Sequence, residues 1–512
     1  MSKLKIASLL LLIFLVRYTK SIKAQGLNSH YLLGYTTGID TNVISNRGVF
    51  QFDSLGYALD SANFKMPFRA AQGTLSDESG NLLMVSNGCW IADATGDTML
   101  NGGGLIPNTF TSNWCNSFTG LPVPHSVVFI PYPNDSNRII LLHQSGTSSS
   151  NFYSDGLYYS VIDKTFNNGL GGVVVGQKNI KLPQTDLIQG MAACKHANGR
   201  DWWIVVFKHN TDLIYTYLLS PSGIVFNSQQ SLGITPNVLH GGQKVFSSDG
   251  KKFAHLYYDG MVGAANNYIR IFDFDRCSGL FSNGIEITFL EPEPGMGVAF
   301  SPDSRKLYFS TFNKIFQINL DTSNIAASKQ TVAINDGYYS PLPPLQSDFW
   351  VMTPAPNGKI YISSGNGVID MHYINYPDSN GVASDVKQHA IRLPCYYARG
   401  HVYHPNYYLG CDTTLGCPCL VSTGVSEHRQ HDFSIKLSPN PGSAGFETLY
   451  LLPQNKKGIL SVYDLQGRLM HKQILPPWST MQHIPASTWA GGVYQVRIES
   501  DGFSSIRKWV KY

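Results

Sequence analysis

The sequence predicts an all-β protein, a propeller of about seven blades followed by a small immunoglobulin-like β-sandwich. Its composition is the first observation behind this prediction, because charged residues make up only 14% of the chain while aromatic residues reach 12% and glycines number 48. A typical domain has about 25% charged residues. The second observation is a phrase that recurs along the body, and the third is a separate strand pattern in the last 80 or so residues. Short strands and tight turns suit this composition better than long helices.

The first 24 residues are expected to be a signal peptide. Lys3 and Lys5 precede an apolar run over residues 6–16 that is too short to span a bilayer, and Ala24 is a small residue suited to cleavage. No other apolar run reaches about 18 residues, so we expect no transmembrane segment. We therefore expect the chain to pass through the periplasm and to be secreted or attached to the outer-membrane surface.

The net charge of +4 is unevenly distributed. Residues 1–24 and 433–512 carry +5 each, which leaves −6 on residues 25–432. A nucleic-acid-binding protein needs a basic surface, so the acidic body argues against nucleic acid as a partner.

Residues 25–410 are expected to form the propeller. A polar turn between two strand-like runs recurs near residues 80, 135, 199, 250, 304 and 358, with the clearest copy over 295–321. Its spacing of about 50 to 60 residues is what a blade of four antiparallel strands requires. An irregular array of sandwiches would not keep this period. Asp249-Gly250 and Asn357-Gly358 are strong hairpin signals.

Two strand-like fragments remain outside these six copies. Residues 29–35 lie near the mature N-terminus, and residues 399–409 follow the last copy. Pairing them in one sheet would complete a seventh blade and remove two exposed edges. We therefore predict that they pair.

Residues 29–409 resemble a group of exported Bacteroidota propellers, loosely related to the seven-bladed YVTN and lactonase-like propellers. The phrases that carry the resemblance are residues 76–88, 99–105, 156–163 and 272–275. The resemblance implies the architecture and supplies no catalytic signature.

A Cys-rich linker is expected over residues 411–432. Export favours disulfides over a metal site, and Cys-x-Cys lacks zinc-ribbon spacing. The candidate disulfide cysteines are Cys89, Cys115, Cys395, Cys411, Cys417 and Cys419. Cys89 with Cys115 is one pairing we consider; the sequence leaves the remaining connectivity open.

Residues 433–512 form a different module of about seven short strands, read as an immunoglobulin-like sandwich. It closely resembles the type A C-terminal sorting domain of the Bacteroidota type IX secretion system. The motif residues that carry the resemblance are Pro439, Asn440, Pro441, Tyr463, Asp464, Gly467, Gly492 and Tyr494. The resemblance implies the type IX translocon as a partner, and usually removal of the tail with attachment to surface lipopolysaccharide. An ordinary adhesive domain is the alternative.

Candidate ligand-binding residues are those that precede the innermost strand of a blade, where side chains converge on the axis. They are His125, Gln189, His240, Arg399 and His401. Glu291 and Glu293 also precede an innermost strand, but they lie in a proline-interrupted loop where we expect them to be exposed. We predict that at least two of the three histidines face the central cavity at one end. Such groups suit a sugar or a metal ion at the axis, although polar residues that only bond backbone and water are the stronger alternative. We assign no catalytic residue, no metal ligand and no cofactor.

Tryptophans are the second kind of binding candidate, because exposed rings stack on sugars and on protein partners. We take Trp90 and Trp114 as candidate ligand-binding residues. Trp202, Trp203 and Trp350 also lie beside Gly, Asn or polar residues. Burial between blades is the competing expectation for all of them.

The leading functional hypothesis is a non-enzymatic surface propeller that binds an unknown glycan or protein. The alternatives are a lactonase-like or other hydrolase that uses the axial end of the channel, and a structural component of the surface or motility machinery. No Gly-rich phosphate loop, zinc-protease helix or nucleophile elbow is present to favour an enzyme.

Overall fold

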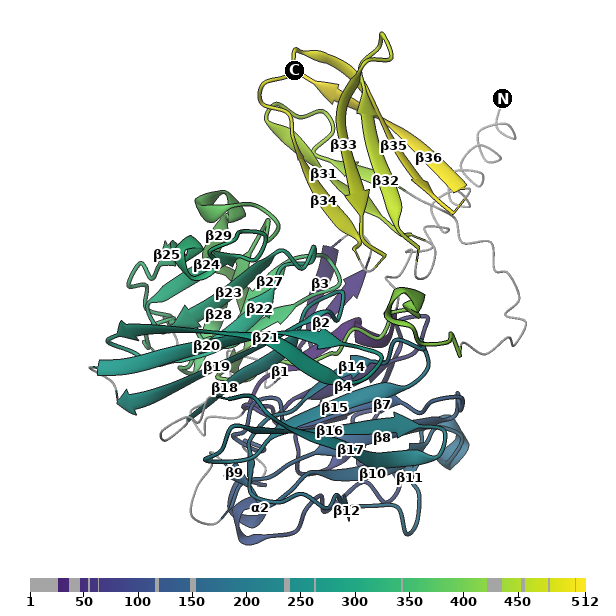
Figure 1. Cartoon of the computed structure of the whole chain (residues 1–512), viewed down its shortest axis with the longest axis vertical. Coiled ribbons are helices and arrows are strands. Elements are labelled where there is room, and N and C mark those ends of the chain that lie inside the picture. Colours follow the sequence, from purple (N-terminus) through teal and green to yellow (C-terminus); the bar gives the residue numbers. More distant parts are fainter. Residues whose placement is uncertain are drawn as a thin grey trace, which may run out of the picture.

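A computed structural model describes residues 26–35, 47–53, 56–62, 64–115, 119–147, 153–233, 240–261, 264–341, 344–420, 435–452, 456–477, 479–501 and 503–512. In these residues the chain is a seven-bladed β-propeller with a separate β-domain standing on it (Figure 1). The predicted signal peptide and the stretch 421–432 lie outside the described residues.

Blades 4 to 7 follow the predicted pattern of four consecutive antiparallel strands. Blade 4 contains β14 (Ala192–Lys195), β15 (Trp202–Phe207), β16 (Leu213–Ser220) and β17 (Gly223–Ser231), and blade 5 contains β18 (His240–Phe246), β19 (Lys252–Met261), β20 (Ala264–Asp275) and β21 (Leu280–Glu291). Blade 6 contains β22 (Gly295–Phe300), β23 (Lys306–Thr311), β24 (Lys314–Asn319) and β25 (Gln330–Ile334), and blade 7 contains β26 (Met352–Pro354), β27 (Ile360–Ile362), β28 (Val368–Ile374) and β29 (Val386–Tyr397).

Blades 1 to 3 are less regular. Blade 1 contains β1 (His30–Leu33), β2 (Gly48–Asp53) and β3 (Gly56–Ser61), and blade 2 contains β4 (Gly73–Ser76), β5 (Leu82–Ser86) and β6 (Ile91–Asp93). Blade 3 contains β7 (Val127–Pro131), β8 (Arg138–His143), β10 (Tyr158–Asp163), β11 (Gly172–Val173) and β12 (Ile180–Lys181). The remaining elements are the pair β9 (Tyr153–Ser154) with β13 (Leu187–Ile188), the helix α2 (Thr109–Trp114), and the 3-10 turns η1 (Gly26–Asn28), η2 (Asn167–Gly169), η3 (Ala326–Ser328), η4 (Gly381–Ser384) and η5 (Thr413–Leu415).

The core lies between blades, because a single blade cannot bury both faces of its own sheet. Strands β22 and β23 are buried at every position, and the innermost strands of neighbouring blades contact one another. The turns that set the repeat are hairpins as predicted. Gly250 and Gly358 take positive φ values of 70° and 78°, which a β-carbon would disfavour.

The predicted pairing of residues 29–35 with 399–409 is wrong. β1 pairs with β2, and no residue between 398 and 411 belongs to a strand. Arg399 has a left-handed backbone with φ of 62°, and Pro405 has no N–H to donate to a ladder. The stretch therefore leaves the extended path of a blade strand, and blade 1 has three strands in the described residues.

Three disulfides stabilise the propeller. Cys89–Cys115 forms as considered from the sequence, and Cys411 pairs with Cys419. Cys417 pairs with Cys277, a residue that the sequence did not suggest. Cys395 was a candidate and is instead a free, fully buried thiol packed in the core between blades 1 and 7. Residues 411–420 are consequently fixed to the propeller, and Leu420 N donates to Asn198 O.

The C-terminal domain is the predicted sandwich of seven strands. One sheet contains β30 (Ile435–Ser438), β31 (Gly445–Tyr450) and β34 (Met481–Pro485), and the other contains β33 (Leu469–Leu475), β32 (Gly458–Tyr463), β35 (Gly492–Ser500) and β36 (Phe503–Lys511). Phe446, Leu460, Val496 and Trp509 are fully buried between the sheets. This core is separate from those of the propeller, and we call the domain the tail.

Candidate functional site at the two ends of the axial channel

The innermost strands of blades 2 to 7 all begin at one end of the propeller and finish at the other. We call these the start end and the finish end. Residues 398–410, called the channel segment, run between them. Gly400 lies at the start end, where an added β-carbon would be 2.6 Å from Ala70 Cα. Gly410 lies at the finish end, where its carbonyl accepts from Arg276 Nη2 at 2.7 Å.

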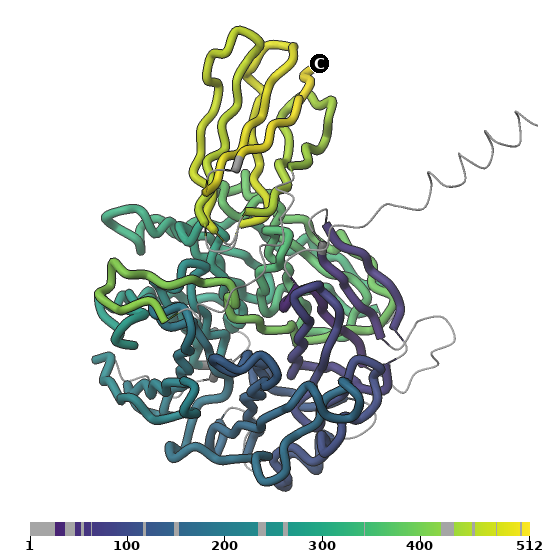
Figure 2. The backbone as a smooth tube through the Cα atoms, turned by 90° about the vertical axis from the view of Figure 1, so that its right-hand side faces the viewer, coloured from purple at the N-terminus to yellow at the C-terminus, as the bar shows by residue number. Residues whose placement is uncertain are grey.

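The channel segment occupies the axis, because its polar groups reach five different blades. The bonds join Val402 O to Thr353 Oγ1 (3.1 Å, blade 7), Tyr403 Oη to Ala193 N (3.2 Å, blade 4), His404 Nε2 to Thr74 O (2.9 Å, blade 2), Asn406 Nδ2 to Ser248 O (2.7 Å, blade 5) and Tyr407 Oη to Phe129 O (2.9 Å, blade 3). Only a chain on the axis can contact blades on all sides. Figure 2 shows this light-green stretch crossing the middle of the propeller. The channel is therefore filled by the protein itself.

Gln243 of β18 in blade 5 forms hydrogen bonds to residues of three other blades, beside the channel segment. Its Oε1 accepts from Val298 N of blade 6 at 2.9 Å and from Met352 N of blade 7 at 2.7 Å. Its Nε2 donates to Met352 O at 2.8 Å and to His125 Nε2 at 2.8 Å. The two backbone N–H donors identify Oε1 as the oxygen, so all four bonds are mutually consistent.

His125 is held as a neutral imidazole by this arrangement. Because Gln243 donates to Nε2, the ring proton must be on Nδ1. Burial first, and the charge of Lys244 second, lower the pKa of His125 to about 3. The ring also stacks on Tyr403 with centroids 4.7 Å apart. His125 thus lies at the axis near the start end, as a packed side chain.

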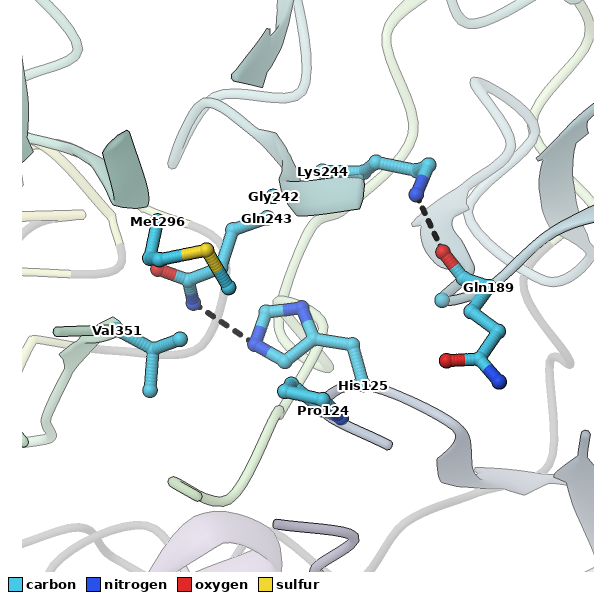
Figure 3. Close-up of a pocket in the computed structure, with 9 residues that line it drawn as sticks. Pro124, His125, Gln189, Gly242, Gln243, Lys244, Met296 and Val351 are labelled. Carbon is cyan, nitrogen blue, oxygen red and sulfur yellow. Dashed lines mark hydrogen bonds between the residues drawn. The ribbon is translucent and has the colours of Figure 1, made fainter. Parts of the chain in front are cut away.

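Lys244 and Gln189 line the same small cavity, shown in Figure 3 with His125 and Gln243. Lys244 Nζ donates to Gln189 O at 2.6 Å, and burial lowers the pKa of Lys244 to about 7. Within the described residues no carboxylate lies in ion-pair distance of Lys244, and Gln189 Nε2 has no hydrogen-bond partner. The cavity volume is about 20 Å³, which is room for about one water molecule.

Of the other two candidate histidines, His401 is described with its side chain and His240 by its backbone alone. His401 is buried on the axis, 5.6 Å from the Tyr31 ring, and burial followed by the charge of His125 lowers its pKa to about 3. Neither of its ring nitrogens has a hydrogen-bond partner among the described residues. His240 begins β18, and its side chain lies outside the described part of the structure.

Two arginines lie close together at the start end. Arg399 is exposed at the channel mouth, with Nε 3.3 Å from Gly365 O. Arg69 lies half-buried beside it, and burial followed by the charge of Arg399 lowers the pKa of Arg69. Burial raises the pKa values of Tyr35 and Tyr258, and the charge of Arg399 acts in the opposite direction on both. Among the described residues, neither arginine has a carboxylate within ion-pair distance.

The tryptophans divide into two groups. Trp114 is half-buried on α2 with the Arg69 guanidinium 5.3 Å from its ring, so it borders the start-end mouth. Trp350 is half-buried against Phe312, at 4.9 Å between ring centroids. Trp202 and Trp203 are only 2% exposed, so for them the expectation of burial holds and the alternative of exposed rings does not. They pack in the core because they lie on the inner part of blade 4. Trp90 is half-buried against the core of blades 1 and 2.

A larger cavity lies at the finish end, where the tail meets the propeller. Its walls are the ends of the innermost strands of blades 4 to 7, the channel segment, Asn28 and the tail loop Ser479–Met481. Its volume is about 150 Å³. The tail is held there by Thr480 Oγ1, which donates to Pro356 O, and by His483, whose ring lies 4.3 Å from that of Tyr376. We call this the tail-side cavity.

From the sequence, a metal ion bound at the axis was one possible ligand. In the described part of the chain, no group of three or more His, Cys, Asp or Glu side chains is arranged to hold a metal ion. Glu291 instead pairs with Lys314 at 2.8 Å, and Glu293 accepts from Asn313 at 2.7 Å.

Sequence reasoning missed Gln243, Lys244 and Arg69. A signal for the first two was present. The next copy of the repeat has Gly297 and Val298 at the corresponding positions of its innermost strand, so Gln and Lys there are unexpected for a buried strand. Nothing in the repeat pattern distinguishes Arg69.

Residues 436–512 match the family model described as the secretion system C-terminal sorting domain. No curated protein sequence matches the chain. No helix in the described part of the chain is long and apolar enough to cross a membrane.

Similar solved structures include a protein from Lactobacillus plantarum, with 12% identity, a TM-score of 0.42, and coverage of 73% of this chain and 98% of that one. Another, from Bacteroides uniformis, is named a putative 6-phosphogluconolactonase; it has 13% identity, a TM-score of 0.40, and coverage of 72% and 97%. Likeness at this level transfers no activity to this chain. The sheets themselves establish the propeller, and the match establishes the tail: the chain is an exported β-propeller protein, secreted or displayed at the cell surface, that ends in a type A C-terminal sorting domain of the type IX secretion system.

Proposed function

We propose that the propeller is a non-enzymatic binding module, which holds a glycan or protein carrying carboxylate or sulfate groups at the start end of the channel. The observation that carries the proposal is the pair Arg69 and Arg399 at the channel mouth, with no carboxylate in ion-pair distance of either among the described residues. Arginine is suited to such ligands because its planar fork bonds two oxygens at once.

The surroundings of the two arginines support binding. Trp114 and Tyr35 border the same mouth and offer ring surface for a sugar or an apolar side chain. The tail stands at the opposite end, so it leaves this face free. Arg399 also has a left-handed backbone, which costs an L-residue about 1 to 2 kcal/mol. Strain of this kind is often retained where a side chain must be presented to a ligand.

Binding on the surface is favoured over chemistry within the channel. The channel segment fills the axis, and the cavity beside His125, Gln189 and Lys244 has a volume of only about 20 Å³. A sugar ring or a lactone needs far more room than one water molecule. In this proposal His125, Gln189 and His401 support the mouth from below, while Arg399 and Trp114 contact the ligand.

A glycan array tests the proposal. Full-length protein is expected to retain acidic glycans, and Arg69→Ala with Arg399→Ala should reduce their binding at least tenfold. Arg305→Ala is the matched control, because Arg305 is an exposed arginine already paired with Asp321. Binding unchanged by the double variant, or turnover of a lactone or glycan by the wild-type protein, would contradict the proposal.

A further inference from the structure

Lys359 and Asn375 face each other at the finish end of blade 7. In the ladder between β27 and β28, Ile360 pairs with Ile374, so Lys359 and Asn375 are the next cross-strand neighbours. Lys359 Nζ lies 2.6 Å from Asn375 Oδ1. Because a C=O bond is about 1.23 Å long, Nζ is no more than about 3.8 Å from the amide carbon Cγ. This is close to the separation of about 3 to 3.5 Å from which bound groups react.

A carboxylate lies on the other side of the same amide. Asp385 Oδ2 accepts from Asn375 Nδ2 at 2.9 Å, within the range of about 2.6 to 3.2 Å in which a side chain transfers a proton. Asp385 Oδ1 is held by Lys387 at 2.9 Å, and Asn375 N donates to Asp385 O at 3.2 Å. Since an amine donates to the amide oxygen and a carboxylate only accepts, the two contacts agree on the orientation of the amide.

The surroundings of Lys359 favour the uncharged amine, which is the nucleophilic form. Its side chain is half-buried, and no carboxylate among the described residues lies in ion-pair distance of Nζ. Burial lowers the pKa of Lys359 below its ordinary value, and the charges of Glu447 and Asp385 oppose this effect less strongly. Asn375 is only 8% exposed, so its amide is shielded from water.

We propose that Lys359 and Asn375 join in an intramolecular isopeptide bond, which the protein forms by itself with Asp385 as the acid–base group. Nζ attacks Cγ, so that the Nζ–Cγ bond forms and the Cγ–Nδ2 bond breaks. Asp385 takes a proton from Nζ and delivers it to Nδ2, which leaves as ammonia. One amine and one amide thus become one amide and one ammonia, without an oxidant, a reductant or any other reactant.

The bond fixes the part of blade 7 that receives the tail. It joins the residue before β27 to the residue after β28, which are 16 positions apart. Tyr376 follows Asn375 directly, and its ring is the one on which His483 of the tail packs. The bond lies at the end of the channel opposite Arg69 and Arg399 and is independent of the function proposed for them.

Tryptic digestion of the denatured full-length protein, followed by mass spectrometry, tests the proposal without any substitution. Residues 330–387 contain Lys359 and end at Lys387, with no other lysine or arginine. Trypsin does not cut at an acylated lysine, so the linked chain should give one peptide, 330–387, lighter than its sequence by one ammonia. Fragment ions should locate the loss at Asn375. Cleavage after Lys359 into two peptides of unaltered mass would overturn the proposal.

Three variants test the roles of the residues. Asp385→Asn removes the proton relay and should give the two separate peptides. Asp336→Asn is the matched control, because Asp336 is a carboxylate on the same tryptic peptide that pairs with His389 instead, and it should keep the linked peptide. Asn375→Ala should restore cleavage after Lys359. The proposal is overturned if the linked peptide persists in Asn375→Ala, or if it forms in Asp385→Asn as completely as in Asp336→Asn.

Discussion

Replacing Gln243 with Met should destabilise the propeller strongly. The change keeps the length of the side chain but removes four hydrogen bonds, two from Oε1 to Val298 N and Met352 N and two from Nε2 to Met352 O and His125 Nε2. Gln243 is only 2% exposed, so its partners would be left unpaired in the interior. At about 1 kcal/mol each, the lower end for a buried unpaired group, the loss is about 4 kcal/mol.

Thermal unfolding followed by tryptophan fluorescence measures this loss. For a propeller of this length, about 4 kcal/mol corresponds to a fall in melting temperature of about 5 °C. Gln144→Met is the control, because Gln144 is fully buried and neither atom of its amide has a partner among the described residues. That variant should be neutral or slightly more stable. A loss below about 1 kcal/mol for Gln243→Met, or equal losses for both, would refute the reasoning.

Three further predictions concern acid, disulfides and export. Burial lowers the pKa of His125, His143, His372 and His401 to about 3. The unfolded chain therefore binds protons below about pH 6.5 that the folded chain does not, and stability should fall from pH 6.5 toward 3 by about 1.4 kcal/mol per histidine per pH unit. A urea midpoint that is flat over this range would contradict the burial. Replacing Cys277 and Cys417 with Ser opens a loop of 140 residues and should lower the free energy of unfolding by about 5 kcal/mol. The same change at Cys89 and Cys115 opens a loop of 26 residues and should lower it by about 3.5 kcal/mol. If the urea midpoints fall in the reverse order, loop entropy is not the origin of the stabilisation. Deleting residues 433–512 should leave the protein in the periplasm, protected from protease added to intact cells, and surface display of the shortened chain would show that the tail is not the export signal.

The sequence was sufficient for features that repeat or lie close together in the chain. Asp249-Gly250 and Asn357-Gly358 mark hairpins because their backbone angles are local, and their spacing gave the blade period. Gly467, one of the tail motif residues, likewise has a positive φ of 77° in the turn between β32 and β33. The disulfide between Cys89 and Cys115 closes a short loop and could be considered for the same reason.

Features that depend on contacts across the axis could not be predicted. The position of the channel segment depends on side-chain hydrogen bonds such as that between Tyr403 Oη and Ala193 N. This bond joins residues 210 positions apart, and such contacts produce no periodic pattern in the sequence. Cys277 pairs with Cys417 only because both meet at the finish end, 140 residues apart. Burial of Trp202 was among the expectations, but its partner was not: Trp202 packs against Tyr407 of the channel segment at 5.9 Å between ring centroids.

The filled channel is the central claim, and hydrogen exchange of residues 400–409 tests it most directly. Their backbone is enclosed by the innermost strands, so their amide hydrogens should exchange as slowly as those of β14. In β14, the Ala193 N–H donates to Tyr403 Oη of the channel segment. A peptide containing Val175, which is 85% exposed, provides the fast reference in the same sample. Slow exchange of 400–409 is the predicted result. Exchange as fast as the reference would mean an open channel, and it would contradict the account.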